Sequence, residues 1–244
     1  MPMRNDHGCR FFVGLLAILL LGTGAPAGAQ QSSDDIMDLT KAMIGLQQAG
    51  KPAEALPLAE RAAALSERNL GPDHQTVALY LDHLAWLHHL VGNQAKAEPL
   101  FQRALAIQGQ IKGGEHVAAA ATCYKLALLY RTMGRDREAE ALLKRAMAIR
   151  SKTLGAKASG VATVAGALAS LYQDQGRYKE AEPLFVQALA IEDNQQGVPH
   201  PALKTTLERY AKLLRDTHRS EQAAQVEARA KAVPKQPKPE RPAP

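Results

Sequence analysis

The chain repeats one pattern of apolar and polar positions at equal intervals along the sequence. In one repeat the apolar positions are Ala181, Leu184, Ala188 and Ile191. They stand 5, 8, 12 and 15 residues after residue 176, which is the fixed point of that repeat. Steps of three and four place such side chains on one face of an α-helix. A second apolar stripe stands at offsets 8, 7, 5 and 4 before the fixed point and predicts another helix there.

The fixed point is a glycine in four of the five repeats, and it marks a turn. The series runs through Gly50, Gly92, Gly134 and Gly176 at equal spacing, and His218 continues it. Glycine is favoured where a helix ends with a positive φ angle. Each unit therefore predicts a helix, a glycine turn and a second helix, with alanines that let the two helices pack closely.

A second set of glycines marks the loops between units: Gly71, Gly113, Gly155 and Gly197. The predicted units are residues 34–70, 71–112, 113–154, 155–196 and 197–233, all within a repeat region at 30–233. Repeats of this kind stack so that each unit buries the apolar face of its neighbour. The pattern predicts an all-α solenoid of about five antiparallel helix pairs, and it leaves no room for a separate catalytic domain.

One stretch carries a family resemblance. Residues 168–191 follow the pattern LAxLYxxxGRYxEAEPLFxxALAI, and residues 197–201 supply a GxxHP loop. This pattern resembles the tetratricopeptide repeat of the kinesin-light-chain-like type, whose unit is longer than the ordinary repeat of about 34 residues. The resemblance implies a right-handed superhelix whose concave side binds other proteins and is lined by the first helix of each unit.

The two ends of the chain differ from the repeats. Arg4 and Arg10 precede a short apolar run at 11–21, and residues 27–29 read A-x-A, so residues 1–29 are predicted to be a secretory signal peptide. We therefore expect an exported protein, periplasmic or secreted, without a membrane span; an uncleaved anchor is the alternative. Residues 234–244 hold five prolines and predict a disordered, basic tail.

Motifs that carry chemistry are missing from the sequence. The chain has no HExxH, GxSxG, P-loop or GxGxxG pattern, so we expect no enzyme, no catalytic residue and no cofactor. Cys123 falls at a predicted packing position, and the only other cysteine, Cys9, lies in the predicted signal peptide. The formal net charge of +6 is modest, and together with export it excludes nucleic acid as a partner.

Three histidines lie close together in one predicted helix. His83, His88 and His89 are separated by steps of five and one, so they point in three different directions at about 100° per residue. They lack the i, i+4 spacing of a metal-binding pair. A histidine-based metal site is therefore the least favoured reading, and we expect no metal ligand.

The predicted concave side holds the candidate binding residues. Aromatic and apolar groups, which dominate interface energies, come from Trp86, Tyr124 and Leu128. Lys125, Arg131, Arg209, Lys212 and Arg215 give a basic bias that suits an acidic partner or a C-terminal carboxylate. Asp82, His83 and His89 complete the set, and Gly166 with Ala167 is expected to leave open space.

These observations favour a non-catalytic interaction module. We expect a monomer that binds a peptide or protein on its concave face in the cell envelope, and the basic bias favours an acidic partner. The alternative is a structural envelope protein that stacks end to end, although the polar final helix at 220–233 disfavours stacking at that end.

Overall fold

The computed structural model describes residues 27–110, 116–193 and 202–234. Within these ranges the chain forms ten helices and no strand. Their bounds are α2 (Ala27–Gln48), α3 (Pro52–Leu70), α4 (Gln75–Leu90), α5 (Gln94–Gln110), α6 (Val117–Thr132), α7 (Asp136–Leu154), α8 (Ser159–Asp174), α9 (Tyr178–Asp193), α10 (Ala202–Asp216) and α11 (Ser220–Ala232). Most of the predicted signal peptide and most of the predicted tail lie outside the described residues.

The helices form five pairs, which confirms the predicted helix–turn–helix unit. At each turn the residue after the fixed point donates its backbone N–H to the carbonyl oxygen of the residue five positions earlier; an example is Arg177 to Tyr172 at 2.8 Å. The turn glycines have φ angles between +71° and +84°. His218 takes φ of +61° at the equivalent place, so the last turn keeps its shape without glycine.

The predicted apolar stripe is buried between the helices. Ala97, Ala139 and Ala181 have no exposed surface, and neither do Ala104, Ala146 and Ala188 further along the same helix faces. Phe101, Leu143 and Phe185 fill the space between units and are also fully buried. The small alanine side chains allow the helix axes to approach closely, as the sequence pattern predicted.

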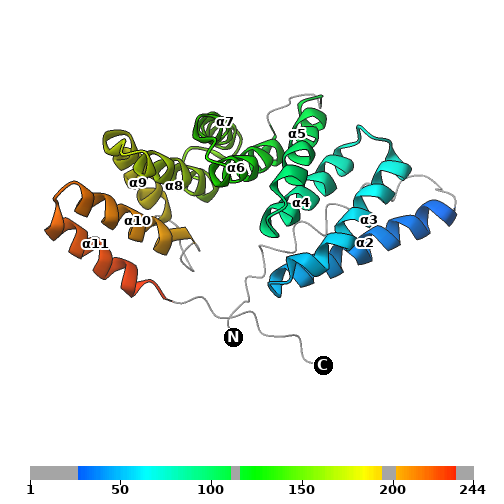
Figure 1. Ribbon diagram of the computed structural model, residues 1–244, viewed down its shortest axis with the longest axis horizontal. Coiled ribbons are helices and arrows are strands. Elements are labelled where there is room, and N and C mark those ends of the chain that lie inside the picture. The colour runs from blue at the N-terminus through cyan, green and yellow to red at the C-terminus, as the bar shows by residue number, and fades with distance from the viewer. Residues whose placement is uncertain (1–26, 111–115, 194–201, 235–244) are drawn as a thin grey trace.

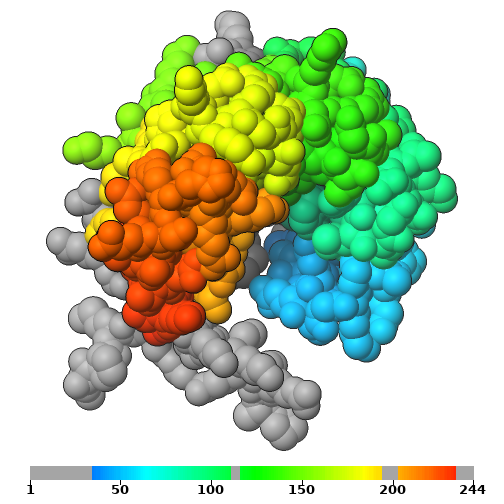
Figure 2. Space-filling view, turned by 60° about the vertical axis from the view of Figure 1, so that its left-hand side comes forward, coloured from blue at the N-terminus to red at the C-terminus, as the bar shows by residue number. Residues whose placement is uncertain are grey.

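The five pairs follow an arch, with α4, α6, α8 and α10 on its inner side (Figure 1). Direct contacts link α4 with α6 and α8 with α10, so these first helices lie close together along the inside of the curve. Figure 2 shows the same band of units curving from the N-terminal to the C-terminal pair around a hollow. The first helix of each of these units therefore supplies the inner face.

Candidate interaction surface

An ion pair connects the two helices α4 and α6 in the N-terminal part of the inner face. Lys125 Nζ of α6 lies 2.5 Å from Asp82 Oδ2 of α4. The Asp82 side chain is only 7% exposed, so the pair is shielded from water and ties the two helices together. The other carboxylate oxygen of Asp82 has no hydrogen-bond partner among the described residues. The predicted site residues Asp82 and Lys125 are therefore brought together, and their charges cancel.

Aromatic side chains lie beside this pair. Trp86 is half-buried, packs against the central core and has its ring centroid 5.1 Å from that of His89. Burial lowers the pKa of His89, and burial together with Lys125 lowers the pKa of His83 to about 4. Both imidazoles are therefore neutral near pH 7, and this part of the surface gains no charge from them.

Tyr124 of α6 packs against an arginine, Arg150, that was not predicted from the sequence. The guanidinium of Arg150 lies 5.7 Å from the centre of the Tyr124 ring, and its Nη1 donates to the Gly160 carbonyl oxygen at 2.7 Å. Burial raises the pKa of the Tyr124 hydroxyl, which keeps it protonated. The sequence holds a pattern that could have revealed Arg150. The position 16 residues after each turn glycine is polar in four units, where it holds Ser66, Gln108, Arg150 and Glu192.

Further along the inner face, most of the predicted basic residues are also paired. Asp174 of α8 binds Arg131 of α6 at 2.7 Å through one oxygen and Arg209 of α10 at 2.9 Å through the other. Arg215 of α10 pairs with Glu227 of α11, and Lys212 is exposed. Three carboxylates thus bind four of the five predicted cations, which reduces the basic bias that the sequence predicted.

The expected open space at Gly166 is filled, so this expectation is wrong. A Cβ atom on Gly166 would lie 3.4 Å from Thr206 Oγ1 of α10. Gln173 Nε2 of α8 also donates to the Arg209 carbonyl oxygen at 3.1 Å. Small residues in a packed protein let a neighbouring helix approach instead of leaving a gap. Helix α10 therefore packs against the inner surface of α8 at Gly166 and Gln173.

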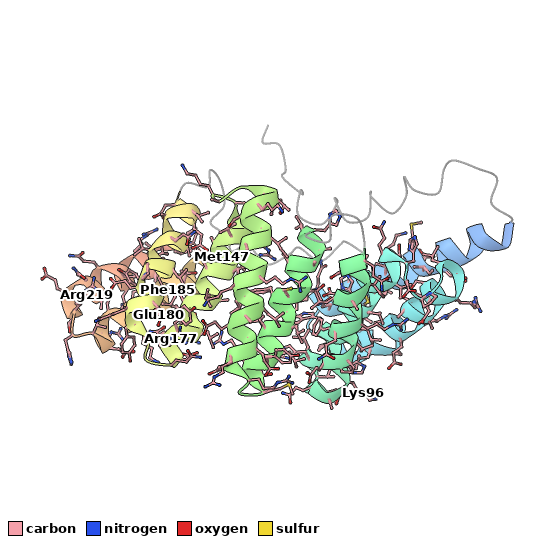
Figure 3. All side chains as sticks on the ribbon, turned by 90° about the horizontal axis from the view of Figure 1, so that it is seen from above. Lys96, Met147, Arg177, Glu180, Phe185 and Arg219 are labelled. Atoms are coloured by element: carbon pink, nitrogen blue, oxygen red, sulfur yellow. The ribbon has the colours of Figure 1, made fainter. Side chains whose placement is uncertain are left out.

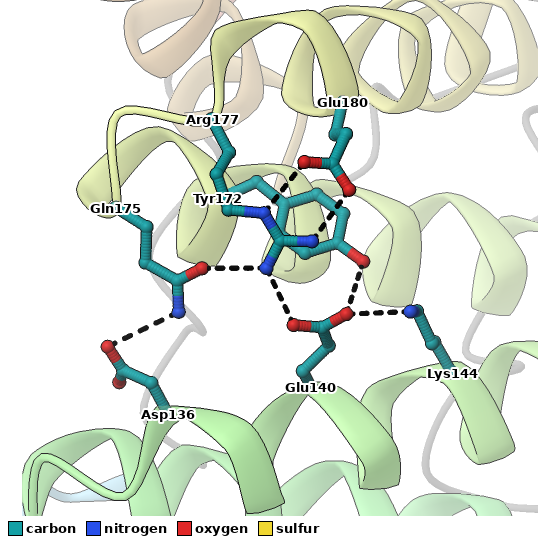
Figure 4. Close-up of polar contacts among 7 residues, drawn as sticks. All are labelled: Asp136, Glu140, Lys144, Tyr172, Gln175, Arg177 and Glu180. Carbon is teal, nitrogen blue, oxygen red and sulfur yellow. Dashed lines mark hydrogen bonds and ion pairs between the residues drawn. The ribbon is translucent and has the colours of Figure 1, made fainter.

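A second polar feature, the turn clamp, lies at the glycine-turn edge of the solenoid. In Figure 3, Lys96, Arg177 and Glu180 lie along this edge. Arg177 donates to Glu140 of the preceding unit at 2.7 Å and to Glu180 of its own unit at 2.6 Å (Figure 4). Its guanidinium also lies 4.0 Å over the ring of Tyr172. The clamp joins consecutive units through matched charges.

The turn clamp recurs at three junctions. Arg135 joins Glu98 to Glu138, and Arg219 joins Glu182 to Gln222. An open depression of about 520 Å³ lies among these residues, lined by Arg135, Glu140 and Arg177. Arg135 and Arg177 in this lining are already bound by carboxylates. The equal spacing of Arg135, Arg177 and Arg219 could have revealed the clamp from sequence.

Other kinds of site find little support in the part of the chain that the structure describes. No group of three His, Cys, Asp or Glu side chains there could hold a metal ion. Burial raises the pKa of the Cys123 thiol, which fits a packing residue rather than a nucleophile. Among the described helices, none combines the length and the apolar character that crossing a bilayer requires.

Stacked helix pairs whose first helices form the inner face of a solenoid are the architecture of a class of helical repeat proteins. The tetratricopeptide repeat model matches residues 44–110, 95–152 and 160–236. The chain therefore belongs to the tetratricopeptide repeat family, whose repeats generally mediate protein–protein interaction and are generally non-enzymatic.

Solved structures show the same fold. A crystal structure of nearly identical TPR-like repeats, from a Podosopora anserina protein assigned as a kinesin light chain, is 26% identical, with a TM-score of 0.67 over 80% of this chain and 93% of that one. A second structure of such repeats is 23% identical, with a TM-score of 0.69 over 86% and 97%. BtubC (BKLC) from P. vanneervenii is 21% identical, with a TM-score of 0.70 over 88% and 95%. No curated protein sequence matched the chain.

Proposed function

We propose that this protein is a non-catalytic interaction module that binds a peptide or protein partner on the inner face of its first helices. The observation that carries the proposal is the half-buried set of Trp86, Tyr124 and Leu128 on α4 and α6. Large side chains that face solvent on a concave surface are the residue types that anchor partners. At the turn edge, by contrast, Arg135 and Arg177 are already bound within the clamp.

The proposal includes a place of action in the cell envelope. It is supported by the basic start, the apolar run and the A-x-A sequence within residues 1–29. Fractionation of cells that make the full chain tests this part: we expect a mature protein that lacks residues 1–29, in the periplasm or the medium. Full-length protein in the cytoplasm would contradict it.

Site-specific photo-crosslinking tests the binding surface even when the partner has not been identified. A photoreactive amino acid at Leu128 should give one dominant crosslinked product in native cells, and Trp86→Ala should reduce its yield. The matched control is the same probe at Val186, which is 49% exposed on the outer helix α9. Crosslinks from Val186 but not from Leu128 would move the site to the outer face and overturn the proposal.

The proposed module acts as a monomer. None of the large apolar residues with high exposure among the described side chains lies on the terminal helices α2 and α11. End-to-end stacking would need such surfaces at both ends. Light scattering over a concentration series should therefore give a constant mass, and a mass that rises with concentration would favour self-assembly.

A further inference from the structure

We infer that the binding surface is confined to α2, α4 and α6, and that it takes a short extended peptide with large apolar side chains and no net negative charge. This inference rests on the proposed function, because it names the partner of the same surface. It differs from the acidic partner that the basic residues of the sequence suggested.

The first argument is the residue at the centre of each first helix. The sixth position before the turn is filled, in chain order, by Ile44, Trp86, Leu128, Ser170 and Lys212. The first three are large, apolar and half-buried, whereas Ser170 is buried and Lys212 is exposed. The inner face therefore changes from apolar to polar between the third and fourth units.

The second argument is charge. On α4 and α6 the cation of Lys125 is bound by Asp82, and the guanidinium of Arg131 is bound by Asp174. An acidic peptide would have to displace a carboxylate that is already in place, and displacing Asp82 would leave a buried charge without a partner. The cations on the apolar part of the inner face are thus already bound within the protein, which suits a neutral occupant.

The third argument is access. Helix α10 lies against α8 through Thr206 at Gly166 and through Arg209 at Gln173 and Asp174. These contacts occupy the inner side of α8 at Gly166, Gln173 and Asp174. In this inference the last helix pair therefore does not itself contact the partner.

The dimensions set the length of the occupant. Neighbouring first helices in contact have axes roughly 8–10 Å apart, so α2, α4 and α6 span roughly 20 Å. An extended peptide advances about 3.3 Å per residue, so about six residues would cross them. Alternate side chains of such a peptide point to the same side, which suits two or three apolar anchors.

Two synthetic peptide pools test the inference on the full chain. Both pools have about eight residues with Leu, Phe or Met at alternate positions. The other positions hold Ser and Gln in the neutral pool and Asp and Glu in the acidic pool. Trp86 is the only tryptophan, so its fluorescence reports occupation of this surface directly.

We expect the neutral pool to shift the Trp86 emission, with an affinity that changes less than about twofold between about 50 and 500 mM salt. Leu128→Ser should lower the affinity at least about tenfold. Lys212→Glu on α10 and Val186→Ser on α9 should leave it unchanged.

Other outcomes distinguish failure of this inference from failure of the proposed function. An acidic pool that binds at least about tenfold tighter, with an advantage that salt removes, would overturn this inference while the proposed function stands. Loss of binding in Lys212→Glu would likewise overturn the confinement to α2, α4 and α6. Failure of both pools to bind, together with no crosslink from position 128, would overturn both the inference and the proposed function.

Discussion

At the glycine-turn edge of the solenoid, equivalent positions of successive units hold the same residue, whereas on the inner face they hold different residues. At the turn edge, Arg135, Arg177 and Arg219 stand at one repeat position, and each binds a glutamate of the preceding unit. On the inner face, one repeat position holds Ile44 and Trp86 in neighbouring units and Lys212 in the last. The residues are thus repeated where consecutive units are joined in the same way, and they vary where we propose that a partner binds.

The first junction adds to this comparison, because it is joined without the turn clamp. Asn93 stands where the later units have arginine, and His88 stands where two of them have tyrosine. Units one and two instead share an apolar cluster that includes Met43, Tyr80 and Leu87. An apolar cluster therefore joins the first two units in place of the clamp, together with the ion pair of Arg103 with Glu67 at 2.6 Å.

The largest expected effect comes from placing a charge in the buried seam that all units share. Ala146→Glu puts a carboxylate where no surface is exposed, and it should lower the free energy of unfolding by more than about 4 kcal/mol. The matched control is Ala148→Glu, on the exposed side of the same helix α7. Circular dichroism melting should show Ala148→Glu close to wild type, and a stable Ala146→Glu protein would contradict the helix register.

Breaking the ion pair under the inner face should have the next largest effect. Lys125→Met leaves the buried Asp82 carboxylate without its cation, which should cost about 3 kcal/mol of unfolding free energy. The double variant Asp82→Asn with Lys125→Met removes both charges and should recover most of that loss in urea unfolding. A double variant no more stable than Lys125→Met would show that the pair is not the reason for the loss.

The turn clamp should contribute less, and its contribution should depend on pH. Hydrogen bonds from Arg177 lower the pKa of Glu140 to about 2, against burial. A depressed carboxyl pKa stabilises the fold above pH 4.5, and this stabilisation is lost as the pH falls toward 2.

Glu140→Gln tests the clamp. It should cost about 1–2 kcal/mol at neutral pH, after allowance for solvent screening, and it should flatten the acid dependence measured by urea unfolding. Glu221→Gln, on the exposed side of α11, is the control and should change neither. An acid dependence equal to that of wild type in Glu140→Gln would refute the clamp.

A pH effect of opposite sign is expected at Glu192. Burial, and then Asp193, raises the pKa of Glu192 to about 7. A raised carboxyl pKa stabilises the fold at low pH, so stability from this group should fall as the pH rises from about 4.5 to about 7. Glu192→Gln should remove that fall. Identical pH profiles for Glu192→Gln and wild type would mean that Glu192 titrates normally.

The fold could be predicted from sequence because each unit is defined by short-range spacing. The glycine turns, the buried alanines at offsets 5 and 12, and the five helix pairs all follow from a period read along one chain. The clamp was within reach of the same method, since its arginines and glutamates keep the period.

The chemistry of the inner face could not be predicted in the same way. Asp82 meets Lys125, and Arg131 meets Asp174, across pairs of residues 43 apart on different helices. Whether such side chains pair with each other or face a partner depends on the distance between neighbouring helices. Gly166 illustrates the point: its sequence gives a small residue, and only the position of Thr206 shows that α10 fills the space.

One comparison of variants tests most directly whether the varied inner-face residues bind a partner and the repeated turn-clamp residues only join the units. The affinity of the neutral peptide pool is measured by Trp86 fluorescence for wild type, Leu128→Ser and Glu140→Gln, at neutral pH and a temperature where all three are folded. We expect Leu128→Ser to lose at least about tenfold in affinity and Glu140→Gln to bind as wild type does, although it is less stable. Equal affinity in Leu128→Ser, or a loss confined to Glu140→Gln, would contradict the division between the two surfaces.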